Sequence, residues 1–363
     1  MPFPRRFIHA LALTVAIASA MSIGGCTASS TTSPKTSQSG AHNTQTTVTH
    51  TTVAKPVSGA PGWRSQALSI GIAAVTSGYD SEVWPGSVAC ATKSFCVAAG
   101  DTGYVWTWNG ARWSSPTKAV EVSQSFEGSF AISCPTSRFC MLISKNEGAI
   151  FDGHTWSPVA VNLQGSGAYP SLSCASAELC LAENGSVSLW NGHEWVSQSE
   201  NLLPNGSASV ACATDGFCLA VDAGSTVVAY EGRSWVNVAG IPTANGVEQL
   251  FCASSVSCLG QDEAGGTRKF NGVAWNRVAP SPLFPALQMA CGGIDFCVAI
   301  SDVDVTVWNG SSWSSPMSLY QRQSLATLTG ISCALNERRC MAILEVLRQG
   351  GVSGDLGLNY RSV

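Results

Sequence analysis

Charged residues are scarce in this sequence, and so is histidine. Asp, Glu, Lys and Arg make up 12% of the 363 residues, about half the usual fraction, which argues against a coiled coil or a charge-rich disordered chain. Lys and Arg number 19 against 23 Asp and Glu, so no basic surplus favours nucleic acid and no nucleic-acid partner is expected. Of the five histidines, only His154 and His193 lie beyond residue 60. Because the cysteines are also spaced too widely for zinc, we expect no metal, and with no phosphate-binding loop, no cofactor.

Cysteine, in contrast, is abundant. The chain has 15 cysteines, a composition typical of disulfide-bonded proteins, and disulfides persist only where thiols are not kept reduced. The sequence therefore predicts an extracytoplasmic protein. Because the number is odd, one cysteine is expected to differ in role from the rest.

The first 25 residues have the features of a secretory signal peptide. Arg5 and Arg6 precede an apolar run, and Ile23-Gly24-Gly25 lies directly before Cys26. Ile-Gly-Gly-Cys resembles the lipobox of bacterial lipoproteins, which implies cleavage before Cys26 and a diacylglycerol on its sulfur. The alternative is an ordinary signal peptide followed by an incidental cysteine. We expect a lipoprotein whose lipid anchors it to the outer side of a membrane in the bacterial cell envelope.

Residues 26–60 carry Cys26 and then mostly Ser, Thr, Gln, Asn and Gly. Such a segment cannot bury enough apolar surface to offset its ordering entropy, so we expect a disordered tether. Residues 61–363 are expected to form the folded domain, as a monomer.

The folded part repeats about every 40 residues. The remaining cysteines form seven pairs: Cys90/Cys96, Cys134/Cys140, Cys174/Cys180, Cys212/Cys218, Cys252/Cys258, Cys291/Cys297 and Cys333/Cys340. Six repeats continue with an aromatic residue and, five residues later, a Trp: Trp108 and Trp113, Phe151 and Trp156, Trp190 and Trp195, Tyr230 and Trp235, Phe270 and Trp275, Trp308 and Trp313. The seventh repeat reaches Tyr360 without a Trp, whereas Gly62-Trp63 begins the domain with one.

This exchange between the two ends predicts a closed ring. In a β-propeller the last blade is commonly completed by a strand from the opposite terminus, which leaves no free edge. We therefore predict an all-β fold, a seven-bladed propeller of four-stranded blades closed by an N-terminal strand. In the first blade we expect strands at 87–90, 95–99 and 104–108, and a fourth from Trp113 onward. Each cysteine pair then lies across a hairpin and forms a disulfide.

The turn before each motif Trp carries a family resemblance. Phe151-Asp152-Gly153-His154-Thr155-Trp156 resembles the Asp-box (BNR) motif of sialidase-like and sortilin-like propellers, although the turn is one residue shorter and most repeats have Asn in place of Asp152. The chain also resembles secreted, cysteine-paired propeller proteins of actinobacterial type. That resemblance implies the fold and no defined activity.

The longest loops predict a binding surface. The spacings from Trp63 to Cys90, from Trp113 to Cys134, from Trp313 to Cys333 and from Cys340 to Tyr360 exceed those of the other repeats. All four excesses fall on neighbouring blades around the closure, here called the seam, and long loops on a rigid scaffold often carry binding residues. The candidate ligand-binding residues of these seam loops are Tyr79, Asp80, Glu82, Trp84, Phe126, Glu127, Tyr320, Arg322 and Arg348. Greater tolerance of insertions near the closure is the alternative explanation.

Three functions are compatible with these features. The first is a non-enzymatic binding or scaffolding module for a protein or glycan partner, which we favour because no catalytic motif is recognisable. The second is a glycan-acting enzyme, sialidase-like or another glycosidase, using carboxylates from the loops that join second and third strands: Asp101, Glu147, Glu183, Asp222, Asp262, Glu263, Asp302 and Asp304. Turn formation is the simpler explanation of these acids. The third is an envelope-protein assembly factor, by analogy of fold.

The cysteine assignment predicts the outcome of mass mapping. The mature protein is expected to yield seven local disulfide-linked peptides and an N-terminal peptide carrying lipid on Cys26. Free or scrambled thiols among the paired cysteines would contradict the blade arrangement, and an unmodified Cys26 would contradict the anchor.

Overall fold

The structure of the chain, a computed structural model, describes residues 63–361 with several gaps. The gaps are 68–84, 101, 123–129, 165–169, 200–201, 223, 239, 241–246, 263–264, 279, 284–287, 320–324 and 348–352. The described residues belong to one compact unit, Thr51–Val363. None of them forms a helix with the length and apolar character needed to cross a membrane. The predicted signal peptide, Cys26 and the tether lie outside the described residues.

The described residues form seven four-stranded antiparallel sheets. Six of them, here called blades 1 to 6, use four consecutive strands each. Blades 1 to 3 contain β2 (Pro85–Thr92), β3 (Phe95–Gly100), β4 (Tyr104–Trp108) and β5 (Thr117–Lys118); β6 (Ala131–Thr136), β7 (Phe139–Ile143), β8 (Glu147–Phe151) and β9 (Trp156–Ala160); and β10 (Ser171–Ser176), β11 (Leu179–Glu183), β12 (Val187–Trp190) and β13 (Trp195–Ser197). Blades 4 to 6 contain β14 (Ser207–Cys212), β15 (Cys218–Asp222), β16 (Val227–Glu231) and β17 (Ser234–Val238); β18 (Val247–Ser254), β19 (Ser257–Asp262), β20 (Thr267–Phe270) and β21 (Trp275–Arg277); and β22 (Gln288–Gly293), β23 (Phe296–Ser301), β24 (Asp304–Trp308) and β25 (Met317–Ser318).

The remaining sheet joins the two ends of the domain. It contains β26 (Leu325–Cys333), β27 (Arg339–Leu347), β28 (Ser353–Arg361) and, on its outer side, β1 (Trp63–Ala67). The backbone pairing of β1 with β28 runs from Trp63 opposite Tyr360 to Ala67 opposite Leu356. We call this the composite sheet. In this sheet β1, from the start of the domain, pairs with the otherwise free edge of β28. This agrees with the prediction from Trp63, which supplies the Trp that the seventh repeat lacks.

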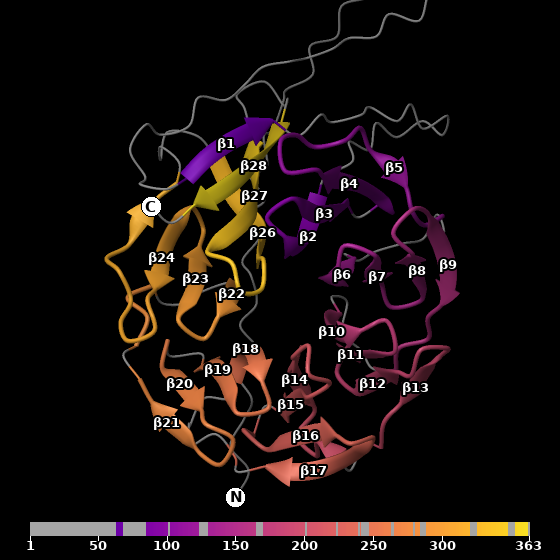
Figure 1. The fold of residues 1–363 in the computed structure, drawn as a ribbon, viewed down its shortest axis with the longest axis vertical. Coiled ribbons are helices and arrows are strands. Elements are labelled where there is room, and N and C mark those ends of the chain that lie inside the picture. Colours follow the sequence, from indigo (N-terminus) through magenta and orange to yellow (C-terminus); the bar gives the residue numbers. More distant parts are fainter. Residues whose placement is uncertain are drawn as a thin grey trace, which may run out of the picture. The chain divides into compact units, whose positions relative to one another are not determined.

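The sheets are arranged radially around a central axis (Figure 1). Their innermost strands contact one another in the order β2, β6, β10, β14, β18, β22 and β26, and β26 contacts β2 again. Apolar side chains from neighbouring sheets fill the spaces between them; the cluster between blades 4 and 5, for example, includes Phe217, Leu219, Phe270 and Trp275. The all-β propeller class is therefore confirmed.

The composite sheet is larger than any one of the six blades, and it corrects the predicted number of blades. β26, β27 and β28 are nine residues long each, and β27 pairs with β28 continuously from Arg339 opposite Arg361 to Leu347 opposite Ser353. The extra residues between Cys340 and Tyr360, which the spacing assigns to a long seam loop, thus mostly extend a hairpin. The predicted seven-bladed propeller is therefore corrected to six blades of four consecutive strands each and one enlarged composite sheet.

The predicted fourth strand also needs correction in two blades. Trp113 and Trp313 make isolated bridges to Trp108 and Trp308, and the fourth strands β5 and β25 begin four residues later, with two residues each. Ser114 and Ser314 explain the interruption, because the hydroxyl of each accepts the backbone N–H of the third strand, at Thr107 and Val307. A side chain therefore replaces part of the backbone ladder.

All seven predicted disulfides are present. Each links the first two strands of a sheet next to the turn that joins them, here called the inner turn. Closing such a short loop stabilises the sheet by roughly 2 kcal/mol in the chain-entropy model. The bonds are Cys90–Cys96, Cys134–Cys140, Cys174–Cys180, Cys212–Cys218, Cys252–Cys258, Cys291–Cys297 and Cys333–Cys340.

The paired cysteines lie in the core, as structural disulfides do. In five blades the second cysteine has no accessible surface and belongs to a hydrophobic cluster: Cys140, Cys180, Cys218, Cys258 and Cys297. A fully buried sulfur cannot contact a ligand that arrives from solvent. The pairing is therefore confirmed, but the role of these cysteines is structural, and they form no part of a binding surface.

In three blades an aromatic side chain also fixes the inner turn. This residue precedes the outer turn, which joins the third and fourth strands. The indoles of Trp108, Trp190 and Trp308 donate to inner-turn carbonyls, those of Lys93, Ala177 and Ile294. Each of these turns is thus held by a disulfide and by a hydrogen bond from the neighbouring hairpin.

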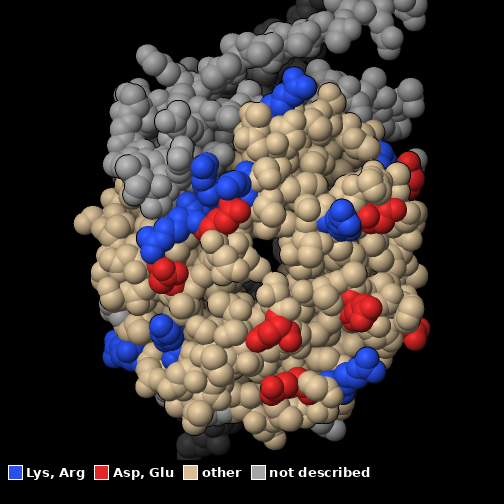
Figure 2. Space-filling view, viewed as in Figure 1, with Lys and Arg blue, Asp and Glu red and all other residues tan. Residues whose placement is uncertain are grey.

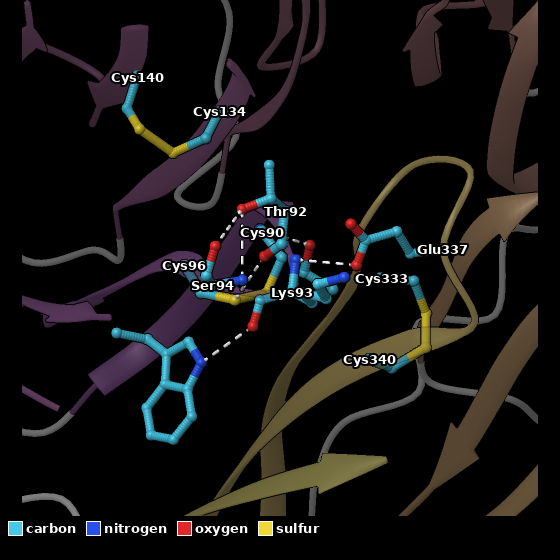
Figure 3. The surroundings of a disulfide bond; sticks show 12 residues. Cys90, Thr92, Lys93, Ser94, Cys96, Cys134, Cys140, Cys333, Glu337 and Cys340 are labelled. Carbon is cyan, nitrogen blue, oxygen red and sulfur yellow. Dashed lines mark hydrogen bonds between the residues drawn. A yellow bond between two sulfur atoms is a disulfide. The ribbon is translucent and has the colours of Figure 1, made fainter. Parts of the chain in front are cut away.

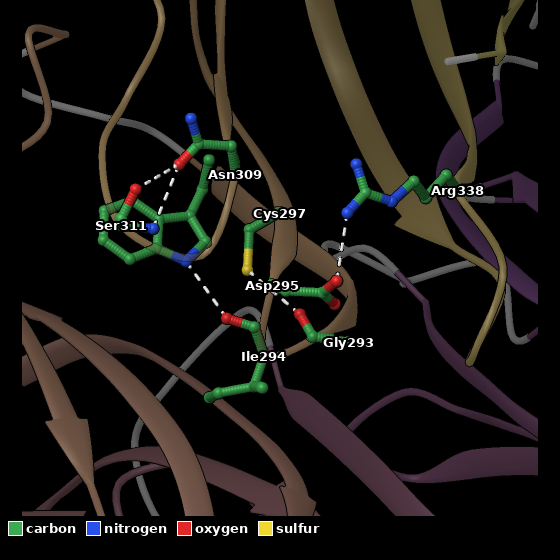
Figure 4. Close-up of polar contacts among 8 residues, drawn as sticks. Gly293, Ile294, Asp295, Cys297, Asn309, Ser311 and Arg338 are labelled. Carbon is green, nitrogen blue, oxygen red and sulfur yellow. Dashed lines mark hydrogen bonds and ion pairs between the residues drawn. The ribbon is translucent and has the colours of Figure 1, made fainter. Parts of the chain in front are cut away.

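The inner turn of the composite sheet, residues 334–339, contacts both neighbouring blades. On one side Glu337 accepts the backbone N–H of Lys93 in blade 1 at 3.0 Å (Figure 3). On the other side the Arg338 guanidinium lies 3.0 Å from the Asp295 carboxylate of blade 6 (Figure 4). Blade 6 approaches closely because it has Gly292 here, where a Cβ atom would collide with the carbonyl oxygens of Ala334 and Glu337. We call residues 334–339 the closing turn.

A pair of deletions tests the closure. Removing residues 61–69 is expected to destabilise the domain far more than removing residues 30–55, because the first deletion removes β1 and exposes the backbone of β28. Urea unfolding of both variants measures the difference. Equal midpoints would contradict the closure by β1.

Candidate functional site

The predicted seam residues cannot be compared with the structure. Residues 68–84, 123–129, 320–324 and 348–352 lie outside the described part of the chain, and these ranges contain every candidate from Tyr79 to Arg348. The seam-loop surface stays a prediction, except that the excess before Tyr360 belongs mainly to the β27–β28 hairpin.

Three of the six described acidic residues between second and third strands accept backbone N–H groups of their own turns. The Asp222 carboxylate is fully buried and accepts the backbone N–H of Thr226 at 2.7 Å and the side-chain amide of Asn205 at 2.9 Å. Asp262 accepts the backbone N–H of Gly266 in the same way in the next blade. These bonds confirm the turn-forming interpretation for Asp222 and Asp262.

Two of these carboxylates have shifted pKa values. Burial raises the pKa of Glu183, against the opposing effect of the Gly185 N–H, which donates to its Oε1 at 2.6 Å. Burial also acts to raise the pKa of Asp222, but the hydrogen bonds from Thr226 and Asn205 outweigh it and hold this pKa below its usual value. Within the described residues no three His, Cys, Asp or Glu side chains gather closely enough to hold a metal ion.

The face shown in Figure 2 is mostly uncharged, with isolated acids and bases around a small central opening. Lys and Arg side chains gather over the junction of blade 6 with the composite sheet, the junction that carries the Arg338–Asp295 ion pair. That ion pair is half exposed at both partners, so it contributes little free energy. It is a side-chain contact between the closing turn and blade 6.

A groove of about 440 Å³ lies between blades 4 and 5. Its floor is the face of the β16–β17 hairpin that points toward blade 5 and includes Ala229, its cross-strand partner Val236, and Val238. Its opposite wall is formed by the two turns of blade 5, at Val256 in the inner turn and at Gly272 and Val273 in the outer turn. We call this the valine groove.

Exposed apolar side chains concentrate in this groove. Among the described residues four large hydrophobic side chains are exposed, and three of them line the valine groove: Val236 at 43%, Val256 at 61% and Val273 at 78%. The fourth is Val196, on β13 in blade 3. Scattered exposed valines need no explanation, but three of them grouped in one groove make this groove a candidate site.

The other repeats show that valine is unusual at these positions. At the position of Val256, two residues before the second cysteine, the other repeats have Ser94, Arg138, Glu178, Gly216, Asp295 and Arg338. At the position of Val273, two residues before the motif Trp, they have Ala111, His154, His193, Arg233 and Ser311. The turn geometry therefore does not require valine at either place.

Glu231, which lines the groove, stands at a position where the other blades have an Asn or Asp that forms the outer turn. In five blades the first side chain of the outer turn accepts two backbone N–H groups of the same turn, as Asn271 accepts from Val273 and Ala274. Blade 4 has Glu231 there, in a turn where Gly232 and Arg233 have positive φ. The Glu231 carboxylate, exposed on the groove, makes no hydrogen bond or ion pair with any residue that the structure describes.

Sequence reasoning directed at loop length does not find this groove. The signal is present as Val256, Val273 and Glu231, which depart from the repeat pattern in turns of ordinary length. Their convergence depends on the contact between two blades, which the repeat pattern alone does not reveal.

The comparisons with known proteins identify the fold alone. No family model matches the chain, and no curated protein matches it. Among solved structures, YCF48 from Cyanidioschyzon merolae is similar with a TM-score of 0.55 at 12% identity, covering 83% of this chain and 99% of that one. A structure described as YCF48 bound to D1 peptide has the same TM-score and identity, covering 85% and 100%. The WD40 propeller domain of Doa1 has a TM-score of 0.53 at 11% identity, covering 77% and 93%.

The buried Asp222 predicts a pH-dependent contribution to stability. Because its folded pKa lies below the unfolded value, its stabilisation is present above the unfolded pKa of about 3.9 and is lost as pH falls through the folded pKa. Asp222→Asn places a second amide against that of Asn205, and we expect it to cost about 1–3 kcal/mol at pH 7. Urea unfolding at pH 7 and pH 3 measures the difference in unfolding free energy between the native protein and the variant, which is expected to be smaller at pH 3. The exposed Asp302→Asn is the control, and an equal cost for Asp222→Asn at both pH values would contradict the assignment.

Proposed function

We propose that this chain is a non-enzymatic binding or scaffolding lipoprotein of the bacterial cell envelope. Lipid on Cys26 anchors it, the segment up to residue 60 serves as a tether, and the propeller presents a surface to a protein or glycan partner. The observation that carries the proposal is the bracing of every sheet by a disulfide beside its inner turn. A surface held in one conformation loses less entropy on binding than a flexible one.

Similar propellers support a binding role by analogy of fold. One of the similar solved structures is described as bound to a peptide, and that property belongs to YCF48. At 12% identity the similarity carries no residue from one protein to the other, since one fold hosts many functions. It makes a polypeptide the partner to test first.

The seam loops are one proposed part of this surface. Their Tyr, Trp and Phe side chains, with Arg322 and Arg348, are the residue types that dominate binding energy at protein interfaces. Glycan binding would use the same aromatic residues by stacking on sugar rings.

Replacing four seam aromatics tests this part. Tyr79, Trp84, Phe126 and Tyr320 are changed together to Ala in the full, lipidated chain, and crosslinked partners are recovered from membranes and quantified. Recovery is expected to fall at least tenfold, since each interfacial aromatic typically contributes more than about 1 kcal/mol. Unchanged recovery, with unchanged thermal unfolding, would contradict the seam surface.

A further inference from the structure

We propose that the valine groove binds an extended segment of a partner polypeptide in which an aliphatic side chain lies next to a Lys or Arg. This rests on the proposed function as a binding module and gives it a second site, away from the seam. The aliphatic side chain would lie among Val236, Val256 and Val273, and the basic group would face Glu231.

The apolar part of the proposal follows from the shape of the groove. The groove has a volume of about 440 Å³ and is open to solvent, so it has room for a few side chains of a segment that lies across it. Val236 extends from the sheet face of blade 4, and Val256 and Val273 extend from the turns of blade 5. Because the side chains come from two elements facing each other, an inserted aliphatic group would contact valine on both sides and remove apolar surface from water.

The walls of the groove are held in place before any ligand arrives. The backbone N–H of Ser255, next to Val256, donates to the Asp215 carboxylate of blade 4 at 3.0 Å. The Val256 side chain packs on Gly272 of the outer turn, where a Cβ atom would lie 2.8 Å from its Cγ1 atom. The Cys252–Cys258 disulfide closes the same inner turn. The gap between the blades is therefore fixed by local contacts.

The charge of the ligand follows from Glu231. Glu231 is an exposed residue of the groove lining, its side chain makes no bond to a described residue, and no Lys or Arg is among the described residues that line the groove. A basic group there would gain a charge-assisted hydrogen bond beside an apolar surface. An acidic group would be repelled, so the groove is expected to discriminate by charge.

An extended segment is the form of ligand that fits. The floor is a pair of antiparallel strands, and β17 is the outermost strand of its sheet, so the groove runs beside strand backbone. An extended chain places alternate side chains on one side, which allows an aliphatic residue to enter while its neighbours stay in water.

A peptide array tests the proposal with the mature full-length protein. The probes are nine-residue Ser/Gly peptides with Val, Ile, Leu or Phe at the centre and Lys, Arg, Ser or Glu at the adjacent position. We expect binding of the Lys and Arg peptides and none of the Glu peptides. The strongest binder is then labelled with fluorescein, and its Kd is measured by anisotropy.

Three variants separate the contributions. Val256→Ser with Val273→Ser introduces the residue that other repeats carry as Ser94 and Ser311, so the turns are expected to fold normally. This double variant is expected to weaken the Kd at least tenfold. Glu231→Gln is expected to bring the Lys and Ser peptides within about twofold of each other, since it removes the charge pairing. Val196→Ser, which changes an exposed valine outside the groove, is expected to leave the Kd unchanged.

Two results would overturn the proposal. The first is that no peptide in the array binds the native protein more tightly than the Val256→Ser, Val273→Ser variant, with both proteins showing equal thermal unfolding and no free thiols. The second is a concentration-dependent dimer, seen by light scattering, that the same double variant abolishes, because the groove would then bind a second copy of this chain.

The membrane crosslinking experiment distinguishes this failure from failure of the proposed function. If the double groove variant recovers partners as the native protein does while the seam variant loses them, the groove proposal fails and the binding function stands. If neither variant nor their combination loses a partner, the binding function fails as well.

Discussion

The backbone pairing of β1 with β28 is the constraint on which the rest of the domain depends. Without it the propeller would end in an unpaired nine-residue strand, an edge that invites aggregation. The pairing joins residues nearly 300 positions apart. Closing so long a loop costs chain entropy, and this cost is small only after the intervening sheets have formed. At the inner end of the same sheet, the closing turn contacts both neighbouring blades, through Glu337 to blade 1 and Arg338 to blade 6.

Much of this architecture could be predicted from the sequence because it repeats. Cysteines six residues apart fix the first hairpin of each blade, and the displaced Trp63 indicates how the ring closes. Repetition fails as a guide where local chemistry intervenes. Ser114 and Ser314 bond to the backbone and delay the fourth strand, and the extra residues after Cys340 extend a hairpin that spacing alone cannot distinguish from a loop.

The candidate site could be predicted only in part, for a related reason. Loop length identifies loops that are longer than those of the other repeats. The turns of the valine groove have the ordinary length and differ from the other repeats only in their side chains. Val256 and Val273 occupy turn positions that carry mostly polar residues elsewhere, and Glu231 replaces a turn-forming Asn or Asp. Each substitution is ordinary by itself. Their significance comes from the packing of blade 5 against blade 4, which brings them to one groove.

Every cystine in the propeller joins two cysteines within a single hairpin, and none joins one sheet to another. The two cysteines of each pair are six or seven residues apart, so each pair can oxidise as soon as its own hairpin forms, with no partner still to come. Correct pairing is then favoured by nearness along the chain, and a wrong pairing requires two hairpins to be open together. Only the final step, the arrival of β28 beside β1, waits for the whole polypeptide.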